Sequence, residues 1–205
     1  MNPPSKIVCV GRNYLEHARE LGNQVPERPL IFLKPPSAIV ADGEPIVLPP
    51  QSQQVEHEGE IAVVIGRTAR KVKAAEAWEY VAGIAPLNDV TARDLQKPDG
   101  QWTRAKGFDT FCPLGAMVPL DAIADRDALE VVCRVNGEVR QRGRVGEMAF
   151  DIPTLIEYIS GVMTLEPGDV IATGTPAGVG PLQPGDVVEV EVPGVGILRN
   201  PVQAA

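Results

Sequence analysis

Glycine and proline interrupt this 205-residue sequence so often that long regular elements are excluded over most of its length. The chain contains twenty glycines and twenty prolines, spread almost evenly. Because both residues mark turns and break helices, they divide the chain into many short elements. The pattern is typical of a β-rich fold with frequent turns, and it argues against a helical bundle or a regular βαβ alternation.

Short runs rich in valine and isoleucine lie between these turns and are predicted to be strands. The predicted strands cover residues 6–10, 30–33, 46–48, 60–65, 131–135, 169–173 and 187–192. Asn136-Gly137, between CRV and EVRQ, is a dipeptide that strongly favours a two-residue hairpin loop. We therefore expect an α+β, β-rich chain.

Helices are predicted in three places. Residues 151–161 begin with Asp151 as a cap and carry Pro153 in the first turn. Residues 73–81 form a second candidate, and residues 13–21 a short third one with Asn13 as its cap. The composition does not change along the chain, so we expect one catalytic domain over residues 1–205, with residues 1–25 as a mobile lid segment.

Charge and cysteine content narrow the classes of partner. The net charge is −8, and lysine and arginine are scattered, which excludes nucleic acid and anionic membranes as main partners. No apolar run approaches the ~18 residues of a membrane span, and the N-terminal sequence lacks a signal-peptide pattern. Three scattered cysteines without a CxxC pair indicate reduced thiols, so we expect a cytoplasmic protein.

Three carboxylates form the most informative pattern. If residues 58–60 enter a strand, Glu58 and Glu60 project from one face about 6.6 Å apart. A solvated strand edge would explain these two, but Asp89 follows the apolar run AGIAPL, where a solvated acid is less expected. Three carboxylates without cysteine predict a hard-cation site for Mg²⁺ or Mn²⁺. Such an ion takes about six oxygens, so the site would keep coordination positions free for chemistry.

The two histidines differ in setting. His17 and Glu20 are three residues apart, so they are neighbours on one helical face. A carboxylate that holds one imidazole nitrogen raises the basicity of the other, which is the general-base arrangement. An ordinary pair on a surface helix is the alternative. His57, by contrast, should point to the strand face opposite Glu58 and serve a structural role.

Two further segments are ambiguous taken alone. Lys106, in TRAKGF, reads as a surface lysine. The glycine-rich residues 173–180 follow a predicted strand but lack the GK[ST] signature, which argues against nucleotide binding. They could instead present backbone N–H groups and the Thr175 hydroxyl to a carboxylate.

Taken together, the segments resemble the fumarylacetoacetate hydrolase family. The matching segments, in the family's order, are VCVGRNYLEHARE, IFLKPPSA, HEGEIAVVIG, NDVTARDLQ, WTRAKGFDTFCPLG, VNGEVRQ and LEPGDVIATGTPAGVGP. They run over nearly the whole chain, which is similar to the compact single-domain acylpyruvate and fumarylpyruvate hydrolases.

The resemblance implies a mixed β-roll of the family's C-terminal domain type, usually dimeric, and roles for nine residues. Glu58, Glu60 and Asp89 would hold Mg²⁺ or Mn²⁺, with Ca²⁺ as a substitute. His17 would be the general base and Glu20 its orienting partner. Lys106 would stabilise oxyanion charge. The implied substrate contacts are Gln96, Thr175 and, less directly matched, Arg12.

The implied activity is metal-dependent hydrolysis of the C–C bond of an acylpyruvate, giving pyruvate and a carboxylic acid. Oxaloacetate decarboxylation or tautomerisation, and hydration or isomerisation of 2-oxo-diene acids, would use the same metal site. The paired His17 and Glu20 favour the hydrolase, since decarboxylation needs no activated water. A non-catalytic metal-binding protein, or a member that acts through protein interaction, is the alternative from a different class.

Overall fold

The computed structural model describes residues 4–20, 22 and 26–205. The described strands are β1 (Ile7–Gly11), β2 (Leu30–Lys34), β3 (Ile39–Val40), β4 (Ile46–Leu48), β5 (Val55–His57), β6 (Gly59–Ile65), β7 (Val81–Asn88), β8 (Thr91–Ala92), β9 (Cys112–Pro113), β10 (Val118–Pro119), β11 (Glu130–Val135), β12 (Glu138–Arg144), β13 (Val170–Ala172), β14 (Gly180–Pro181), β15 (Val187–Val192) and β16 (Gly196–Ala204). The described helices are α1 (Leu15–Glu20), α2 (Arg93–Asp99), α3 (Thr103–Lys106) and α4 (Ile152–Val162), with short 3₁₀ segments η1 (Pro36–Ala38), η2 (Ala74–Tyr80), η3 (Leu120–Ala122) and η4 (Val145–Glu147). The expected β-rich α+β chain with few short helices is confirmed.

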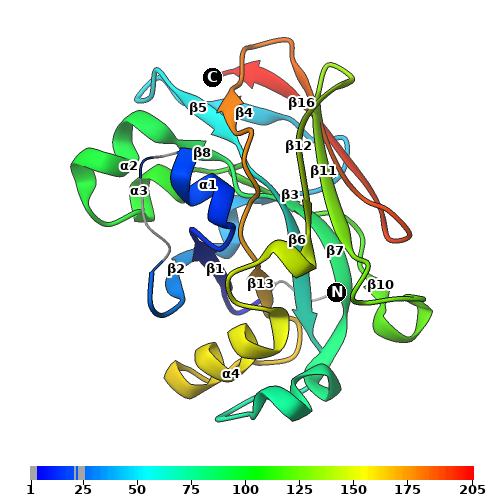
Figure 1. The fold of residues 1–205 in the computed structure, drawn as a ribbon. Coiled ribbons are helices and arrows are strands. Elements are labelled where there is room, and N and C mark those ends of the chain that lie inside the picture. Colours follow the sequence, from blue (N-terminus) through cyan, green and yellow to red (C-terminus); the bar gives the residue numbers. More distant parts are fainter. Residues whose placement is uncertain (1–3, 21, 23–25) are drawn as a thin grey trace.

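Two larger sheets carry the fold. The six-stranded sheet has the order β10-β7-β6-β13-β1-β2, and the five-stranded sheet has the order β12-β11-β15-β16-β4. Two smaller sheets, β14-β5-β8 and β3-β9, extend them. In Figure 1, α1, α2 and α3 lie on one side of the molecule, and β11, β12 and β16 on the other.

The core lies between the two larger sheets. Ile61 and Val63 of β6 belong to the same buried cluster as Val131, Cys133 and Val190 of the five-stranded sheet. A second buried cluster covers the opposite face of the six-stranded sheet. Because β6 is buried on both faces, it reads as a continuous apolar run rather than an alternating one.

The hairpin and the longest helix follow the sequence. Asn136 and Gly137 have φ angles of 53° and 80°, and they connect β11 to β12. Positive φ at both loop residues is the type I′ requirement that Asn-Gly meets at low cost. Asp151 accepts a hydrogen bond from Thr154 N–H at 2.8 Å, so it caps α4 as expected.

Two local predictions were wrong, and a third lies partly outside the described residues. Residues 74–80 form a 3₁₀ segment rather than an α-helix, because extended residues flank this short connector directly on both sides. Asn13 does not cap α1, since its side chain bonds to the backbone of Phe150 and Thr173 instead. The predicted lid covers residues 1–25, of which 1–3, 21 and 23–25 lie outside the described residues.

The sheet register explains how distant segments meet. β1 and β13 are parallel neighbours, so the segments after them, α1 and residues 173–178, leave the same edge of the sheet. β6 runs antiparallel to β13, so its first residues lie at that edge as well. No helix among the described residues is both long and apolar enough to cross a bilayer.

Candidate active site

The antiparallel register of β6 and β7 brings the three predicted carboxylates to one end of the six-stranded sheet. Gly59 pairs with Asn88 in antiparallel register, so Glu58, which precedes Gly59, lies opposite Asp89, which follows Asn88. Asp89 N–H donates to Glu58 O at 2.8 Å. One oxygen each of Glu58, Glu60 and Asp89 lies within 4.8 Å of the others, and all three side chains are buried. We call these three residues the carboxylate cluster.

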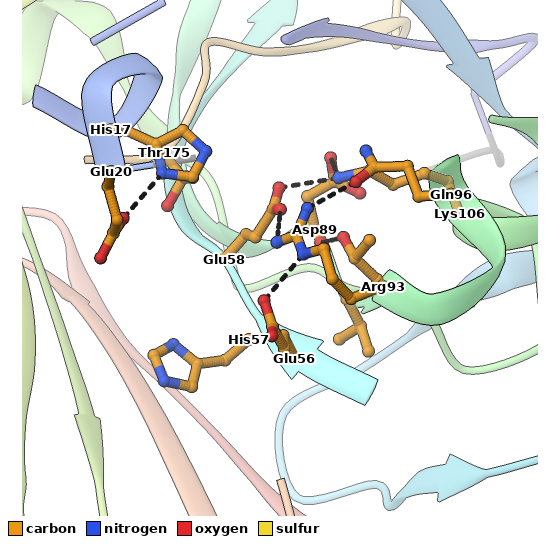
Figure 2. A network of polar contacts seen from close by, with 12 residues as sticks. His17, Glu20, Glu56, His57, Glu58, Asp89, Arg93, Gln96, Lys106 and Thr175 are labelled. Carbon is orange, nitrogen blue, oxygen red and sulfur yellow. Dashed lines mark hydrogen bonds and ion pairs between the residues drawn. The ribbon is translucent and has the colours of Figure 1, made fainter. Parts of the chain in front are cut away.

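Cationic side chains contact two members of the cluster, Glu58 and Asp89, and Figure 2 shows two of them, Lys106 and Arg93. Lys106 Nζ donates to Glu58 Oε2 and to Asp89 Oδ2, at 2.7 Å each. Lys34 Nζ donates to Asp89 Oδ1 at 2.6 Å. Arg93 donates to Glu58 Oε1 from α2. The sequence context of Lys106 alone suggested a surface lysine. The structure shows instead that Lys106 is buried and pairs with two carboxylates.

Glu60 differs from its two neighbours. Within the described part of the chain it accepts a hydrogen bond from Gly174 N–H at 2.8 Å and forms no ion pair. Burial opposes ionisation of Glu58, but Lys106 and Arg93 outweigh it and lower the pKa of Glu58. Burial, reinforced by Asp89 and Glu58, raises the pKa of Glu60 well above its usual value.

These features fit a divalent cation. The donors are carboxylate oxygens alone, which suits Mg²⁺ or Mn²⁺ better than Zn²⁺. No described cationic side chain pairs with Glu60 directly, so a cation beside it would supply the missing ion-pair partner. Glu58, Glu60 and Asp89 can therefore hold such an ion.

His17 reaches the same cavity from α1, and Glu20 contacts His17 from behind. His17 is 4% exposed, and its Nδ1 lies 3.2 Å from Glu20 Oε2. If Nδ1 carries the proton that this contact requires, the remaining nitrogen, Nε2, is free to accept one. His17 lines the cavity together with the carboxylate cluster. The structure thus places the predicted dyad beside the predicted metal ligands, from segments about forty residues apart.

Backbone N–H groups of the loop after β13 donate hydrogen bonds to two carboxylates of the chain. Gly174 N–H binds Glu60, and Gly178 N–H donates to Glu20 at 3.0 and 3.2 Å. Gly178 has φ of 99°, and a Cβ there would meet a backbone oxygen at 2.0 Å, so only glycine fits. Thr175 donates its hydroxyl proton to Gly59 O at 2.9 Å, so it offers a substrate only an acceptor as folded.

The remaining predicted contacts lie at the cavity mouth. Gln96 accepts from Arg93 Nη1 at 2.6 Å, which leaves its amide N–H groups free to donate. Arg12 also lines the cavity and is half-buried, and its backbone has a left-handed φ of 58°. This cavity beside the carboxylate cluster, which we call the inner cavity, has a volume of about 50 Å³.

His57 points away from Glu58, as expected (Figure 2). Its Nδ1 lies 3.0 Å from Gln141 Oε1, and Gln141 Nε2 donates to Thr175 Oγ1 at 2.7 Å. Burial lowers the pKa of His57, so the ring is neutral. His57 and Gln141 therefore brace the Thr175 loop and contribute no ligand to the cluster.

Sequence reasoning did not identify Lys34, Arg93 or Trp102 as site residues. Lys34 ends the apolar strand LIFLK and is 1% exposed. A lysine in such a run requires a buried partner, which is the signal that could have identified it. Arg93 lies four residues after Asp89 in NDVTARD, but no spacing rule links the two residues across a strand end. Trp102 packs edge-on against Phe32 at the cavity wall.

Comparisons with known proteins agree over nearly the whole chain. A family model described as fumarylacetoacetate (FAA) hydrolase C-terminal matches residues 6–203. The structure of a 5-carboxymethyl-2-hydroxymuconate delta-isomerase from Mycobacterium smegmatis is 52% identical, with a TM-score of 0.91 over 99% of this chain and 80% of that chain. A fumarylpyruvate hydrolase from Pseudomonas aeruginosa, in complex with Mn²⁺ and pyruvate, is 32% identical, with a TM-score of 0.93 over 99% of this chain and 91% of that chain. An oxaloacetate decarboxylase, mitochondrial, from Dictyostelium discoideum is 47% identical over 180 residues, covering 85% of this chain and 83% of that protein.

Proposed function

The chain belongs to the fumarylacetoacetate hydrolase family, and from that premise we propose that it is a divalent-metal-dependent hydrolase of acylpyruvate-type 2,4-dioxo acids. The products would be pyruvate and a carboxylic acid. The observation that carries the proposal is that His17, paired with Glu20, lines the same cavity as the carboxylate cluster. A family fold alone leaves several reactions open, whereas a buried imidazole oriented by a carboxylate serves a reaction that needs activated water.

Glu58, Glu60 and Asp89 would hold Mg²⁺ or Mn²⁺. When bound, the ion supplies a Lewis acid for the 2-oxo group and its carboxylate, an effect worth several kcal/mol. The Mn²⁺ and pyruvate bound to the related hydrolase support this assignment by similarity.

His17 Nε2 would take a proton from water as the water oxygen attacks the distal carbonyl carbon. Glu20 holds Nδ1 and stabilises the imidazolium that results. The C–C bond then breaks, and His17 returns the proton to the methylene carbon, which becomes the methyl group of pyruvate. One water is consumed for each bond cleaved.

Lys106 would stabilise negative charge on the attacked carbonyl oxygen. Its ammonium group has three N–H donors, and Glu58 and Asp89 use two of them. The third is available to a substrate oxygen, and one good donor of this kind contributes about 3–4 kcal/mol to the transition state. Gln96 would add a further donor at the cavity mouth.

The α1 segment would act as a lid. Glu20 accepts a hydrogen bond from Gly178 N–H, so this carboxylate links the short helix to the loop after β13. Release of this contact would open a path for substrate. We also propose that the protein is a homodimer, and light scattering should then give twice the 21.9 kDa mass of the chain.

Oxaloacetate decarboxylation or tautomerisation is the second candidate, favoured by the 47% identical relative. This reaction needs the metal ligands but no water-activating base. The two candidates therefore differ in how much they depend on His17.

A panel assay separates them. Acetylpyruvate, fumarylpyruvate and oxaloacetate would be supplied with Mg²⁺ or Mn²⁺, and products identified for the parent, His17→Ala and Glu16→Ala, an exposed neighbour on α1. We expect hydrolysis of an acylpyruvate that falls by roughly 10²–10⁴-fold in His17→Ala and is unchanged in Glu16→Ala. Turnover of oxaloacetate alone, or parental hydrolysis by His17→Ala, would contradict the hydrolase.

A further inference from the structure

A second, larger cavity adjoins the inner one. It has a volume of about 580 Å³ and is lined by residues of α2, the turn after it and the segment after β1. Arg12, Arg93, Gln96 and Trp102 line both cavities, so the two meet at these side chains. We call the larger one the outer cavity.

The inner cavity is much the smaller of the two, at about 50 Å³ against about 580 Å³. It opens into the outer cavity at the side chains that line both. A 2-oxo acid bound through its head to the carboxylate cluster can therefore extend its tail past Arg12 and Trp102 into the outer cavity.

The outer cavity is cationic on an acidic protein. Among the described residues its lining includes Arg12, Arg93 and Lys97 and no carboxylate, although the chain carries a net charge of −8. Arg93 is already neutralised, because it bonds to Glu56 and Glu58. Arg12 and Lys97 are thus the cations that remain for a ligand.

The acids nearest in sequence to Lys97 are occupied elsewhere. Asp94, three residues earlier on α2, accepts from Ser52 and Gln53. Asp99 pairs with Arg104. Within the described residues, neither Lys97 nor Arg12 forms an ion pair.

We propose that Arg12 and Lys97 bind a second carboxylate at the far end of the substrate, so the protein selects 2-oxo acids with an acidic tail. This inference deepens the proposed function and rests on it for the placement of the substrate head. A tail carboxylate would gain charge-assisted hydrogen bonds that a neutral tail cannot form. Lys97 is then a specificity-determining residue rather than one that takes part in bond cleavage.

A matched ligand pair tests the proposal without turnover. 2-Oxoglutarate and 2-oxopentanoate have the same five-carbon chain and differ in the tail carboxylate. Calorimetric titration of the Mn²⁺-loaded protein should show tighter binding of 2-oxoglutarate by roughly tenfold, as expected for one charge-assisted contact in a half-exposed site.

Three variants assign the preference to Lys97. Lys97→Met should remove most of it by weakening 2-oxoglutarate alone, and Lys97→Arg should keep it. Lys73→Met, which removes an exposed lysine that pairs with Glu157, is the matched control and should bind both acids as the parent does. Exposed charges are screened by salt, so the preference should also fall as ionic strength rises.

The outcomes are distinct from those of the panel assay. Equal binding of the two acids by the parent, an unchanged preference in Lys97→Met, or equal weakening of both acids by that variant would overturn the proposal. Binding of neither acid would overturn the proposal, while the proposed function would still be decided by hydrolysis in the panel assay. A preference lost in Lys97→Met without hydrolysis of any 2,4-dioxo acid would support the tail site and contradict the hydrolase.

Discussion

The salt bridges of the five-stranded sheet and those of the carboxylate cluster join the same kinds of group in opposite surroundings. Arg199 and Glu189 connect β16 to β15, with the arginine side chain 63% exposed. Lys106 and Asp89 are 2% exposed each. An exposed pair contributes about 0–1 kcal/mol to stability, whereas loss of one partner from a buried pair costs about 3–5 kcal/mol.

The difference indicates what each set of charges is for. The five-stranded sheet is held by its apolar core, and its ion pairs lie outside that core. The cluster concentrates acids and cations in one buried place, where transfer from water is costly. Such an arrangement adds little net stability over an apolar core, and groups with displaced pKa values gather where proteins carry out chemistry. Substitutions in the two regions should therefore affect different properties.

The largest expected effect is on activity, in Glu58→Gln. Loss of a metal ligand that also binds Lys106 and Arg93 should lower every activity of the panel by on the order of a thousandfold, or about 4 kcal/mol. Glu56→Gln makes the same change two residues away, at a side chain that binds Arg93 but is not in the cluster. It should cost about tenfold. Equal losses in the two variants would remove the distinction between ligand and neighbour.

Lys34→Met should be the most destabilising of the lysine changes. It removes a buried partner of Asp89 and should lower the free energy of unfolding of the metal-free protein by about 3 kcal/mol in urea titration. Lys73→Met breaks a pair whose side chains are 78% and 40% exposed, and it should change stability by about 0.5 kcal/mol or less. Similar values for both would mean that burial does not set the strength of these pairs.

Asp169→Asn tests a buried carboxylate that lies outside the active site. Asp169 accepts from Ser5, Lys6 and the backbone of Glu166. Burial opposes its ionisation, but these bonds outweigh it and lower the pKa of Asp169. The stabilisation is therefore fully present above the unfolded-state pKa, about 3.9, and is lost as pH falls through the lower folded-state value.

We expect Asp169→Asn to cost about 2 kcal/mol at pH 7, and less below about pH 4. Urea unfolding of the parent and variant across this range measures the difference. Asp121→Asn, at an exposed position, is the control. A cost that stays constant with pH would show that ionisation of Asp169 is not the source of the stabilisation.

The smallest effect should be in Glu20→Gln. Glutamine can still accept from Gly178 N–H and from His17, but it cannot stabilise an imidazolium by charge. We expect a loss of about tenfold in kcat for hydrolysis and little change in KM. An intact rate would leave His17 as a base that needs no carboxylate partner.

Local signals predicted much of the fold. The strands at 46–48 and 187–192 have the expected bounds, because valine and isoleucine dominate them. Strand β7 was missed, because Gly83 and Pro86 lie inside it and read as turn residues. The strand tolerates Pro86, which has no N–H to donate, because β10 pairs with β7 only at Gly83 and Ile84 and does not reach the proline.

The site was predictable in its composition but not in its electrostatics. Glu58, Glu60 and Asp89 were identified from their spacing and their apolar surroundings, supported by family resemblance. The partners Lys34 and Arg93 were not, because their contacts depend on the register between β2, β7 and α2 rather than on any local pattern. Lys97 also needed the structure, since only the outer cavity shows which cations lack a partner among the described residues.

Metal dependence of turnover tests the central claim most directly. The protein would be exhaustively demetallated, assayed with the most active substrate of the panel, and titrated with Mn²⁺ while bound metal is counted. We expect no turnover without metal and full recovery when one ion is bound per chain. Glu58→Gln should fail to retain that ion. Parental turnover in the demetallated protein would contradict the central claim.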